Sequence, residues 1–318
     1  MDFKQLQIFT MVCETGSLCK ASDRLWISQP ALTRHIKLLE HEIGQALFIR
    51  TGRGMRLTEA GAELKARVSG LVEQLENAVD EVRASSSRPS GKVVLGIVPS
   101  INYLLASRIV VRAARELPDI RLCIVEGFSS TLIDWLHRGD ADAIIIYGPG
   151  ADLHLRVREM VYEELFLIAP ASAQFDEEEI PFSYLADRQL VLPRRPNGLR
   201  SQVEAAFEKA GVALRVKYEI DSFHVLKALV AAEVGCTILP FSALDQDKSL
   251  AKLKIIKLTK PNIMRQIVMA LPSDRADTRA TEAVVALVED EVRRMVDCGE
   301  WKAIASAAAP PAEPSLIE

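Results

Sequence analysis

The sequence predicts an α/β protein with a small all-α domain at its N-terminus, and three observations support this fold class. The chain has 318 residues, 49% of them hydrophobic, which is enough for two or three folding units. Residues 1–58 show the apolar spacing of short helices separated by tight turns. From residue 92 onward, short apolar strands alternate with helices, which is typical of a mainly parallel, doubly wound α/β architecture.

Residues 1–25 predict two consecutive helices. Apolar residues between positions 6 and 12 indicate the first helix, which Gly16 and Ser17 end. A short second helix follows over about 18–25, with two inward-facing residues one turn apart. The turn after this helix leads into a third helical segment.

The third helix is expected to begin near Gln29, because Ser28 is suited to the N-cap and Pro30 to the first helical turn. Apolar residues then recur at spacings of 4, 3 and 4 and form one buried face: Leu32, Ile36, Leu39 and Ile43. The opposite face is polar and basic and presents Thr33, Arg34 and Lys37. Such a helix, joined to the preceding one by a tight turn, satisfies the geometry for entering a DNA major groove.

Base reading is assigned to the N-terminal end of this third helix, which is lined by Gln29, Pro30, Thr33 and Arg34. Arg34 is long enough to reach a guanine edge, and Thr33 could contact a thymine methyl group. Contacts to the DNA backbone or minor groove are expected mainly from Ser28, Lys37 and Arg53. The alternative for Arg34 is a surface ion pair with Glu40 or another acid.

A small hairpin is expected after the third helix, with strands near 47–50 and 55–57. Arg53 lies between two glycines at its tip, where an arginine can approach phosphates or a minor groove. Between Lys20 and Arg56 the sequence has seven basic and three acidic residues, a local charge of +4, whereas the whole chain carries −4. Positive charge gathered in one small region is expected where a protein meets phosphate. The alternative is a solvated basic face.

Residues 59–86 predict a long helix with one narrow apolar stripe. The stripe follows spacings of 4, 3, 4, 3 and 4 through Leu64, Val68, Leu71, Leu75, Ala78 and Val82. A polar helix with such a heptad seam usually pairs with a partner, so the 64–82 segment is expected to form a dimer. The alternative is packing of the seam on its own domain.

Residues 87–91 are expected to form a flexible hinge, and residues 92–298 the larger α/β region. The expected strands are 92–98, 120–126, 141–147, 165–169, 189–192, 215–220, 236–239, 253–258 and 266–271. The expected helices are 103–115, 130–137, 199–210, 224–233 and 278–296. The alanine- and proline-rich segment 299–318 is expected to be a disordered tail.

The N-terminal residues resemble the winged helix-turn-helix of LysR-type transcriptional regulators in both order and spacing. The matching positions are Ser17-Leu18, Ala21, Leu25, Ser28-Gln29-Pro30-Ala31-Leu32-Thr33, Ile36, Leu39-Glu40, Ile43-Gly44, Leu47-Phe48, Arg50 and Leu57-Thr58-Glu59-Ala60-Gly61. Weaker likeness continues through 96–100, 138–142 and 235–240. Among the departures, Glu233 stands where a glycine is common. Within the family, the chain looks most similar to regulators of nitrogen assimilation.

The resemblance implies a periplasmic-binding-protein-like sensor of two doubly wound α/β subdomains. Subdomain I is expected over 92–161 and 267–298 and subdomain II over 162–266, with the chain crossing near Tyr162 and Arg265. It further implies a homotetramer, built as a dimer of dimers, that bends promoter or operator DNA under the control of a small-molecule effector. RNA polymerase is a further expected partner.

A small anionic or strongly polar effector is expected in the cleft between the subdomains. Ser100 precedes one helix and Ser129 and Ser130 precede another, and helix N-termini present unpaired N–H donors and positive dipole ends. The family resemblance supports Ser100 and Ser129 as effector contacts. Arg194 and Asn197 are the expected contacts from the opposite subdomain. The alternative is ordinary N-capping by the serines and solvation of the arginine.

Other classes of function find little support in the sequence. Nucleophile elbows, phosphate-binding loops, dinucleotide fingerprints and metal-spaced histidines are missing, so no enzyme activity, metal or cofactor is expected. The five scattered cysteines suit a reducing cytoplasm, and neither an export signal nor a membrane span of about eighteen apolar residues occurs. A free solute-binding receptor would need an export signal and no helix-turn-helix. The sequence therefore predicts a cytoplasmic regulator of transcription.

Overall fold

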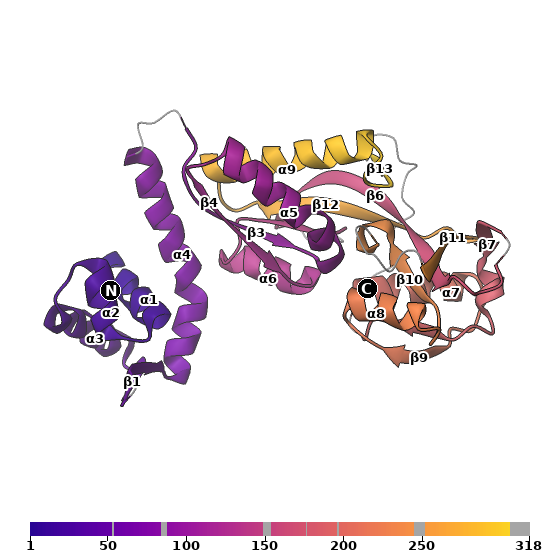
Figure 1. Ribbon diagram of the computed structural model, residues 1–318. Coiled ribbons are helices and arrows are strands. Elements are labelled where there is room, and N and C mark those ends of the chain that lie inside the picture. The colour runs from indigo at the N-terminus through magenta and orange to yellow at the C-terminus, as the bar shows by residue number, and fades with distance from the viewer. Residues whose placement is uncertain are drawn as a thin grey trace. The chain divides into compact units, whose positions relative to one another are not determined.

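The computed structural model describes residues 1–52, 54–83, 88–148, 154–175, 177–195, 197–244 and 252–305. The chain divides into two compact units (Figure 1). The first contains Met1–Gly91 with Trp135–Asp140, and the second contains Lys92–Asp134 with Ala141–Glu318. Within the described residues, no helix is both long enough and apolar enough to cross a membrane.

The first unit consists of three helices, a hairpin and a long helix, as the sequence predicts. Their bounds are α1 Phe3–Thr15, α2 Leu18–Leu25, α3 Gln29–Ile43, β1 Phe48–Thr51, β2 Gly54–Leu57 and α4 Glu59–Arg83. Asp2 and Gln5 form a reciprocal capping box at the start of α1, and Gly16 ends that helix in the left-handed conformation. Ser17 then caps α2 by accepting a hydrogen bond from the N–H of Lys20.

The apolar stripe of α3 lies in the core of this unit. Leu32, Ile36 and Leu39 are buried, and Ile43 packs against the same cluster while half-buried. The other buried members are Ile8, Phe9, Val12, Ala21, Leu47 and Phe48. Because this stripe anchors α3 to α1 and α2, the polar face of α3 is left on the surface.

Gly61 allows α4 to pass directly over the backbone that leads into β1. The Thr58 hydroxyl donates to the carbonyl of Ala46 and accepts from the N–H of Gly61, which fixes the helix start there. A Cβ added at Gly61 would lie 2.1 Å from the carbonyl oxygen of Leu47. The glycine of the Leu57-Thr58-Glu59-Ala60-Gly61 motif is therefore required by packing.

We expect Gly61→Ala to destabilise the first unit by about 1 to 3 kcal/mol, because the added methyl group overpacks a backbone contact. Thermal unfolding followed by circular dichroism should show the loss. Gly52→Ala is the matched control, because a Cβ there meets nothing within 4 Å and the residue does not lie in the left-handed region. A Gly61→Ala protein as stable as wild type would contradict the packing explanation.

The second unit is built on a mixed sheet whose connected strands run in the order β4-β3-β5-β12-β6-β11-β7, with β10 and β13 also paired to β6. Its strands are β3 Gly91–Ile97, β4 Ile120–Glu126, β5 Ala143–Tyr147, β6 Leu155–Pro170, β7 Glu179–Pro181, β8 Leu190–Leu192, β9 Val216–Glu219, β10 Thr237–Pro240, β11 Leu253–Thr259, β12 Met264–Pro272 and β13 Ala303–Ala305. Its helices are α5 Pro99–Glu116, α6 Ser129–Arg138, η1 Phe182–Leu185, α7 Gly198–Lys209, α8 Phe223–Ala231, η2 Phe241–Ala243 and α9 Arg279–Asp297. Helices α5 and α9 lie together on one side of the strands and α6 on the other (Figure 1).

The α/β class is as predicted, but two long antiparallel strands join the halves of the sensor. β12 pairs antiparallel with both β5 and β6, and β6 pairs antiparallel with β10 and β11. The sequence predicted only 165–169 of β6, because the first half of this strand is exposed and charged and so lacks an apolar run. Parallel pairing is retained between β3 and β5 and between β8 and β9.

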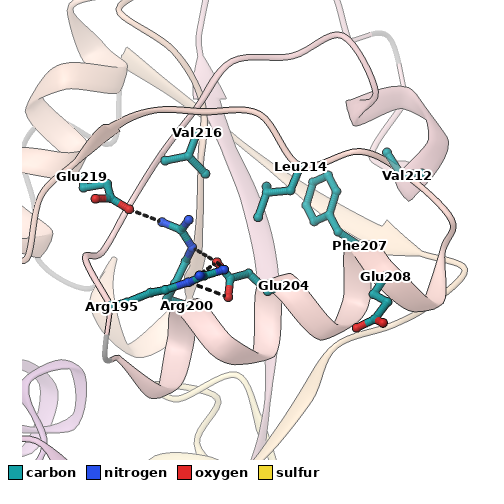
Figure 2. A pocket seen from close by; sticks show the side chains of 9 residues that line it. All are labelled: Arg195, Arg200, Glu204, Phe207, Glu208, Val212, Leu214, Val216 and Glu219. Atoms are coloured by element: carbon teal, nitrogen blue, oxygen red, sulfur yellow. Dashed lines mark hydrogen bonds and ion pairs between the residues drawn. The ribbon is translucent and has the colours of Figure 1, made fainter.

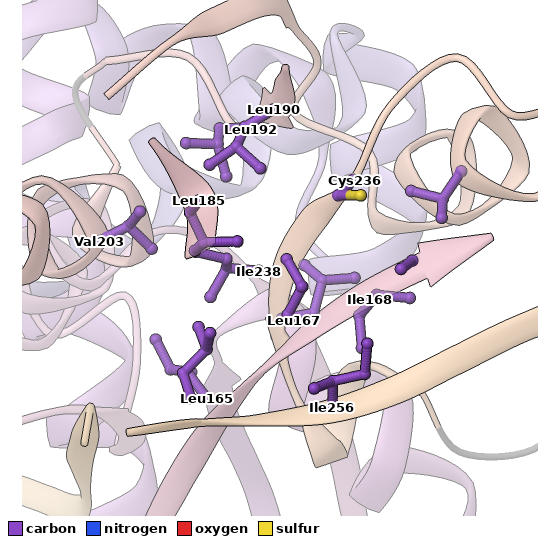
Figure 3. Packing of buried hydrophobic residues seen from close by; sticks show 14 of the residues in the cluster. Leu165, Leu167, Ile168, Leu185, Leu190, Leu192, Val203, Cys236, Ile238 and Ile256 are labelled. Carbon is purple, nitrogen blue, oxygen red and sulfur yellow. The ribbon is translucent and has the colours of Figure 1, made fainter. Parts of the chain in front are cut away.

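A second apolar cluster lies where β6, β10 and β11 meet. Figure 3 shows Leu165, Leu167 and Ile168 of β6 beside Ile238 of β10 and Ile256 of β11. Helix α7 contributes Val203 and Phe207 to this cluster. This apolar core supports the half of the sensor that contains residues 170–240.

The expectation of a disordered segment from residue 299 is wrong for residues 299–305. Trp301 is 1% exposed, and β13 pairs with β6 at Tyr162 and Glu163. Composition alone hid this contact, because one tryptophan and one short strand anchor an alanine-rich segment. Residues 306–318 of the predicted tail and 87 of the predicted hinge lie outside the described residues.

Candidate DNA interface and effector site

The N-terminal end of α3 presents its predicted base-reading residues to solvent. Gln29, Pro30 and Arg34 are exposed, and Thr33 is half-buried. Ser28 occupies the N-cap position but makes no side-chain cap hydrogen bond, so its hydroxyl is available to another acceptor or donor. Lys37 is exposed one turn further along the helix, in keeping with its predicted role at phosphate.

Arg34 has no acidic partner among the described residues. Glu40, the acid named as its alternative partner, accepts hydrogen bonds from the N–H groups of Leu47 and Phe48 at 2.8 and 3.2 Å. This carboxylate therefore fixes the start of the hairpin against α3. The guanidinium of Arg34 is left free to meet a ligand, which favours the base-reading interpretation.

The hairpin formed by β1 and β2 carries two further exposed arginines. Arg50 and Arg56 are exposed on its two strands, and the N–H of Met55 donates to the carbonyl of Gly16 at 2.9 Å. That bond attaches the hairpin to the turn between α1 and α2. Arg53, predicted at the tip of the hairpin, lies outside the described residues.

The apolar stripe of α4 changes its environment along the helix. Leu64 and Val68 pack against the core of the first unit, which was the alternative to dimerisation. Leu71 and Leu75 are instead 55% and 54% exposed, one turn apart. Ala78 and Val82 belong to α4, but their side chains lie outside the described part of the structure. Of the seam residues whose side chains the structure describes, Leu71 and Leu75 are thus the two that are exposed in a single chain.

In the sensor, Ser100 lies in the first turn of α5, which begins earlier than the sequence suggested. Ser100 is fully buried, and its hydroxyl does not cap the helix. The hydroxyl shares a hydrogen bond of 2.6 Å with the hydroxyl of Tyr147 and accepts one of 3.0 Å from Nη2 of Arg265. Ser100 therefore joins α5 to β5 and β12.

Ser129 and Ser130 form the first turn of α6, with Ser129 half-buried and Ser130 exposed. In the other half of the sensor, Arg194 and Asn197 both have partners within the protein. Arg194 is exposed and forms an ion pair with Asp221, while Asn197 caps α7 by accepting from the N–H groups of residues 199 and 200. The exposure of Arg194 agrees with the alternative of a solvated arginine, whereas Asn197 acts as a helix cap, for which no alternative was named.

A buried ion pair that sequence reasoning did not identify lies on the two crossing strands. Nε and Nη2 of Arg265 donate to one oxygen of Glu163 at 3.0 and 2.7 Å, and both side chains are 0% exposed. The other oxygen of Glu163 accepts from the N–H of Ser242 at 2.8 Å and from the indole N–H of Trp301 at 3.2 Å. The predicted crossing points near Tyr162 and Arg265 were the available clue, but nothing in the sequence paired these two charges.

The electrostatics of this pair keep the arginine charged. Burial lowers the pKa of the Arg265 guanidinium, but Tyr147 and Glu163 raise it by more, so that the net pKa lies above its ordinary value. The guanidinium also lies over the Tyr147 ring, 4.2 Å from its centroid. A permanent positive charge is therefore located beside Ser100 in the interior of the sensor.

A separate surface groove of about 500 Å³ lies between α7 and β9 (Figure 2). Arg200 lies between Glu204 and Glu219 and bonds to both. Burial raises the pKa of Glu204, and hydrogen bonds from Arg195 and Arg200 lower it by more, so the carboxyl is more acidic than usual. Four of the charged groups of this groove therefore satisfy one another: Arg195, Arg200, Glu204 and Glu219. In the described part of the chain, no cluster of three or more histidine, cysteine or acidic residues could hold a metal ion.

Two family descriptions match nearly the whole chain. Residues 3–62 match the bacterial regulatory helix-turn-helix protein, lysR family, and residues 86–293 match the LysR substrate binding domain. The second match includes Ser100, Glu163 and Arg265, and the first includes all of α3.

Individual proteins agree with these matches. The nitrogen assimilation regulatory protein nac of Klebsiella aerogenes is 29% identical over 76% of this chain and 79% of its own. A full-length OxyR variant from Pseudomonas aeruginosa has a TM-score of 0.72 at 23% identity, over 92% of this chain and 98% of that one. Full-length CbnR complexed with its target DNA has a TM-score of 0.67 at 21% identity, over 92% and 99%. The chain therefore belongs to the LysR family of transcriptional regulators, with an N-terminal helix-turn-helix and a C-terminal substrate-binding domain.

Proposed function

We propose that this regulator reads promoter DNA with the N-terminal end of α3 and responds to a small anionic effector bound in its sensor. Gln29, Pro30, Thr33 and Arg34 contact base edges, while Ser28, Lys37 and Arg53 contact the backbone or minor groove. The exposed part of the α4 seam joins two chains, and two such dimers form a tetramer. The protein acts in the cytoplasm, with the DNA-binding unit over 1–58 and the sensor over 92–298.

The observation that carries this proposal is the uncommitted polar surface at the start of α3. Arg34 is exposed and without an acidic partner among the described residues, because Glu40 is engaged by the backbone of β1. An arginine in this position can form two hydrogen bonds with a guanine edge in the major groove. CbnR, which shares this fold, has been solved in complex with its target DNA, and this supports DNA binding by the present chain.

We expect Arg34→Ala to weaken specific DNA binding by about 1 to 3 kcal/mol and to leave binding to random duplexes much less affected. The measurement is a gel shift on the upstream intergenic DNA and on a shuffled duplex of equal length. Arg67→Ala is the matched control, because Arg67 is exposed on α4 and its loss changes the net charge equally. An unchanged ratio of specific to random affinity in a folded Arg34→Ala protein would rule out the base-reading role.

Lys37→Ala should behave differently from Arg34→Ala. A lysine that contacts phosphate contributes to binding of every sequence, so its loss should weaken specific and random duplexes alike. The dependence of log K on log salt should become shallower by about one unit. Salt titrations of both variants on both duplexes provide this comparison. An unaltered salt slope for Lys37→Ala would exclude a phosphate contact.

The function proposed here is regulatory and includes no catalytic step. Burial raises the pKa of the Cys13 thiol to about 12, with Lys65 opposing it only in part. Burial also raises the pKa of the Cys236 thiol. Protonated thiols are poor nucleophiles, so neither cysteine is suited to covalent chemistry at neutral pH.

A further inference from the structure

Two buried hydrogen-bond donors at the start of α5 have no acceptor among the described residues. One is Nη1 of Arg265, whose residue is 1% exposed. The other is the backbone N–H of Ser100, a fully buried residue. In the same helical turn, Pro99 has no N–H, and the N–H groups of Ile101 and Asn102 already donate to the Val98 carbonyl. Buried donors of either kind are rarely left unpaired in folded proteins.

The two donors belong to residues whose side chains are already in contact. Nη2 of Arg265 donates to the hydroxyl of Ser100 at 3.0 Å, which fixes the guanidinium against the first turn of α5. Glu163 occupies the Nε and Nη2 edge of the guanidinium, and the Tyr147 ring covers one of its faces. Nη1 is therefore the part of the guanidinium that can still donate a hydrogen bond to a ligand lying in the guanidinium plane.

The chemistry of these donors selects an anion. A guanidinium nitrogen and a backbone N–H can each donate to one oxygen of a carboxylate, and charge-assisted bonds of this type are the strong ones. The N-terminus of a helix of 18 residues adds its own positive dipole end. The oxygens of Glu163 have their donors already, so this carboxylate does not supply the missing acceptor.

We propose that Arg265 is the anion-binding residue of the effector site, and that the effector is a small carboxylate. One of its oxygens accepts from Nη1 of Arg265 and the other from the N–H of Ser100. This inference rests on the proposed function, because it names the chemical class of the effector and the residue that selects it. Arg265 thereby takes the role that the sequence assigned to Arg194.

The same position links binding to a change in the sensor. The guanidinium contacts α5 through Ser100 and η2 through the Ser242 hydroxyl at 3.4 Å, so it connects two elements that pack against each other. Because the site is fully buried, a carboxylate reaches it only when α5 and η2 separate. A carboxylate that then joins Ser100 of α5 to Arg265 stabilises the arrangement in which α5 and η2 are separated.

The test measures thermal unfolding of the full-length protein with acetate, succinate and benzoate at constant ionic strength. Acetamide, succinamide and benzamide are the neutral controls of the same shape. We expect at least one carboxylate to raise Tm, by roughly 5 °C at a hundredfold excess over its Kd, and its amide to have no effect. The Glu163→Gln/Arg265→Gln double variant, which removes both buried charges, should lose the rise.

Two further variants keep the test decisive. Arg200→Gln/Glu204→Gln removes another largely buried ion pair of the sensor and should retain the rise. If the double variant at 163 and 265 does not fold, Arg265→Lys keeps a charge for Glu163 but removes the second terminal nitrogen, and it should lose the rise. The assignment would be overturned if no carboxylate raised the Tm of the wild-type protein, or if the amides raised it equally. It would also be overturned if a carboxylate still raised the Tm of the Arg265 variants.

A gel shift on the upstream intergenic DNA separates this inference from the function on which it rests. Wild-type protein that binds this DNA but ignores every carboxylate contradicts the role of Arg265 alone. Protein that fails to bind the DNA contradicts the proposed function itself.

Discussion

Changing Leu71 and Leu75 together to aspartate is expected to abolish high-affinity operator binding while the sensor stays folded. These leucines are more than half exposed in the single chain, so the substitutions remove little from its own core. In a paired α4 seam the same positions become buried, and an unpaired charge there is strongly unfavourable. The substitutions therefore destabilise the dimer much more than they destabilise the fold of one chain.

The loss of DNA affinity follows from geometry. A dimer places two recognition helices about 34 Å apart, so that both enter successive major grooves on one face of the duplex. A single chain can use one half-site only and loses the contribution of the other. Sedimentation velocity and a gel shift on the same preparations measure assembly and affinity together.

Ala62→Asp with Ala66→Asp is the matched control for this pair. Both alanines are exposed on α4 with the same spacing of four residues, outside the predicted seam. The control adds equal negative charge near the DNA and reports how much of the loss is electrostatic repulsion. A double leucine variant with unchanged sedimentation would show that Leu71 and Leu75 do not join the chains.

The fold of the DNA-binding unit could be predicted closely because its determinants are local. The helix ends are marked by Gly16, Ser17 and Pro30. The preferences of these residues for helix ends depend only on residues close to them in sequence. The stripe of α3 has the period of a helix with one buried face, and Leu32, Ile36 and Leu39 are indeed buried. Gly61 was matched as part of a motif, but its physical reason, the carbonyl of Leu47, required coordinates.

The sensor was harder to predict because its defining contacts join distant residues. Glu163 and Arg265 are 102 positions apart, and each lies just outside the apolar run of its strand, which covers residues 165–169 in β6 and 267–271 in β12. The position of Glu233 is instructive in another way. The resemblance placed a glycine there, and Glu233 does adopt a left-handed φ of +61°. Glu233 therefore adopts a conformation that glycine takes more easily, which the sequence pattern alone left open.

The residues predicted for the effector site lie in different environments. Ser100 lies in the polar network, but Asn197 caps a helix and Arg194 is paired at the surface. Sequence reasoning sought the cation in an exposed loop rich in arginine, because loops often carry binding residues. The buried cation instead comes from β12, where burial of a charge requires a partner that only the tertiary structure supplies.

Removing the charge of Glu163 alone is expected to destabilise the sensor by about 3 to 5 kcal/mol, the usual cost of breaking a fully buried ion pair. Glu163→Gln keeps the size of the side chain but leaves the buried guanidinium of Arg265 without a counter-charge. The Glu163→Gln/Arg265→Gln double variant removes both charges, so its loss should be clearly smaller than that of either single variant. Tryptophan fluorescence during urea unfolding can follow the transition, because the buried Trp301 indole donates to Glu163.

Arg158→Gln serves as the surface control, since its side chain is 45% exposed and its partner Glu289 is also accessible to solvent. Surface pairs contribute about 1 kcal/mol or less, so this variant should unfold close to wild type. Equal losses for Glu163→Gln and the double variant would mean that uncompensated charge is not the cause. A Glu163→Gln loss below that of Arg158→Gln would show that the pair does not stabilise the crossing between β6 and β12, and the polar contacts to Ser242 and Trp301 would then carry that role.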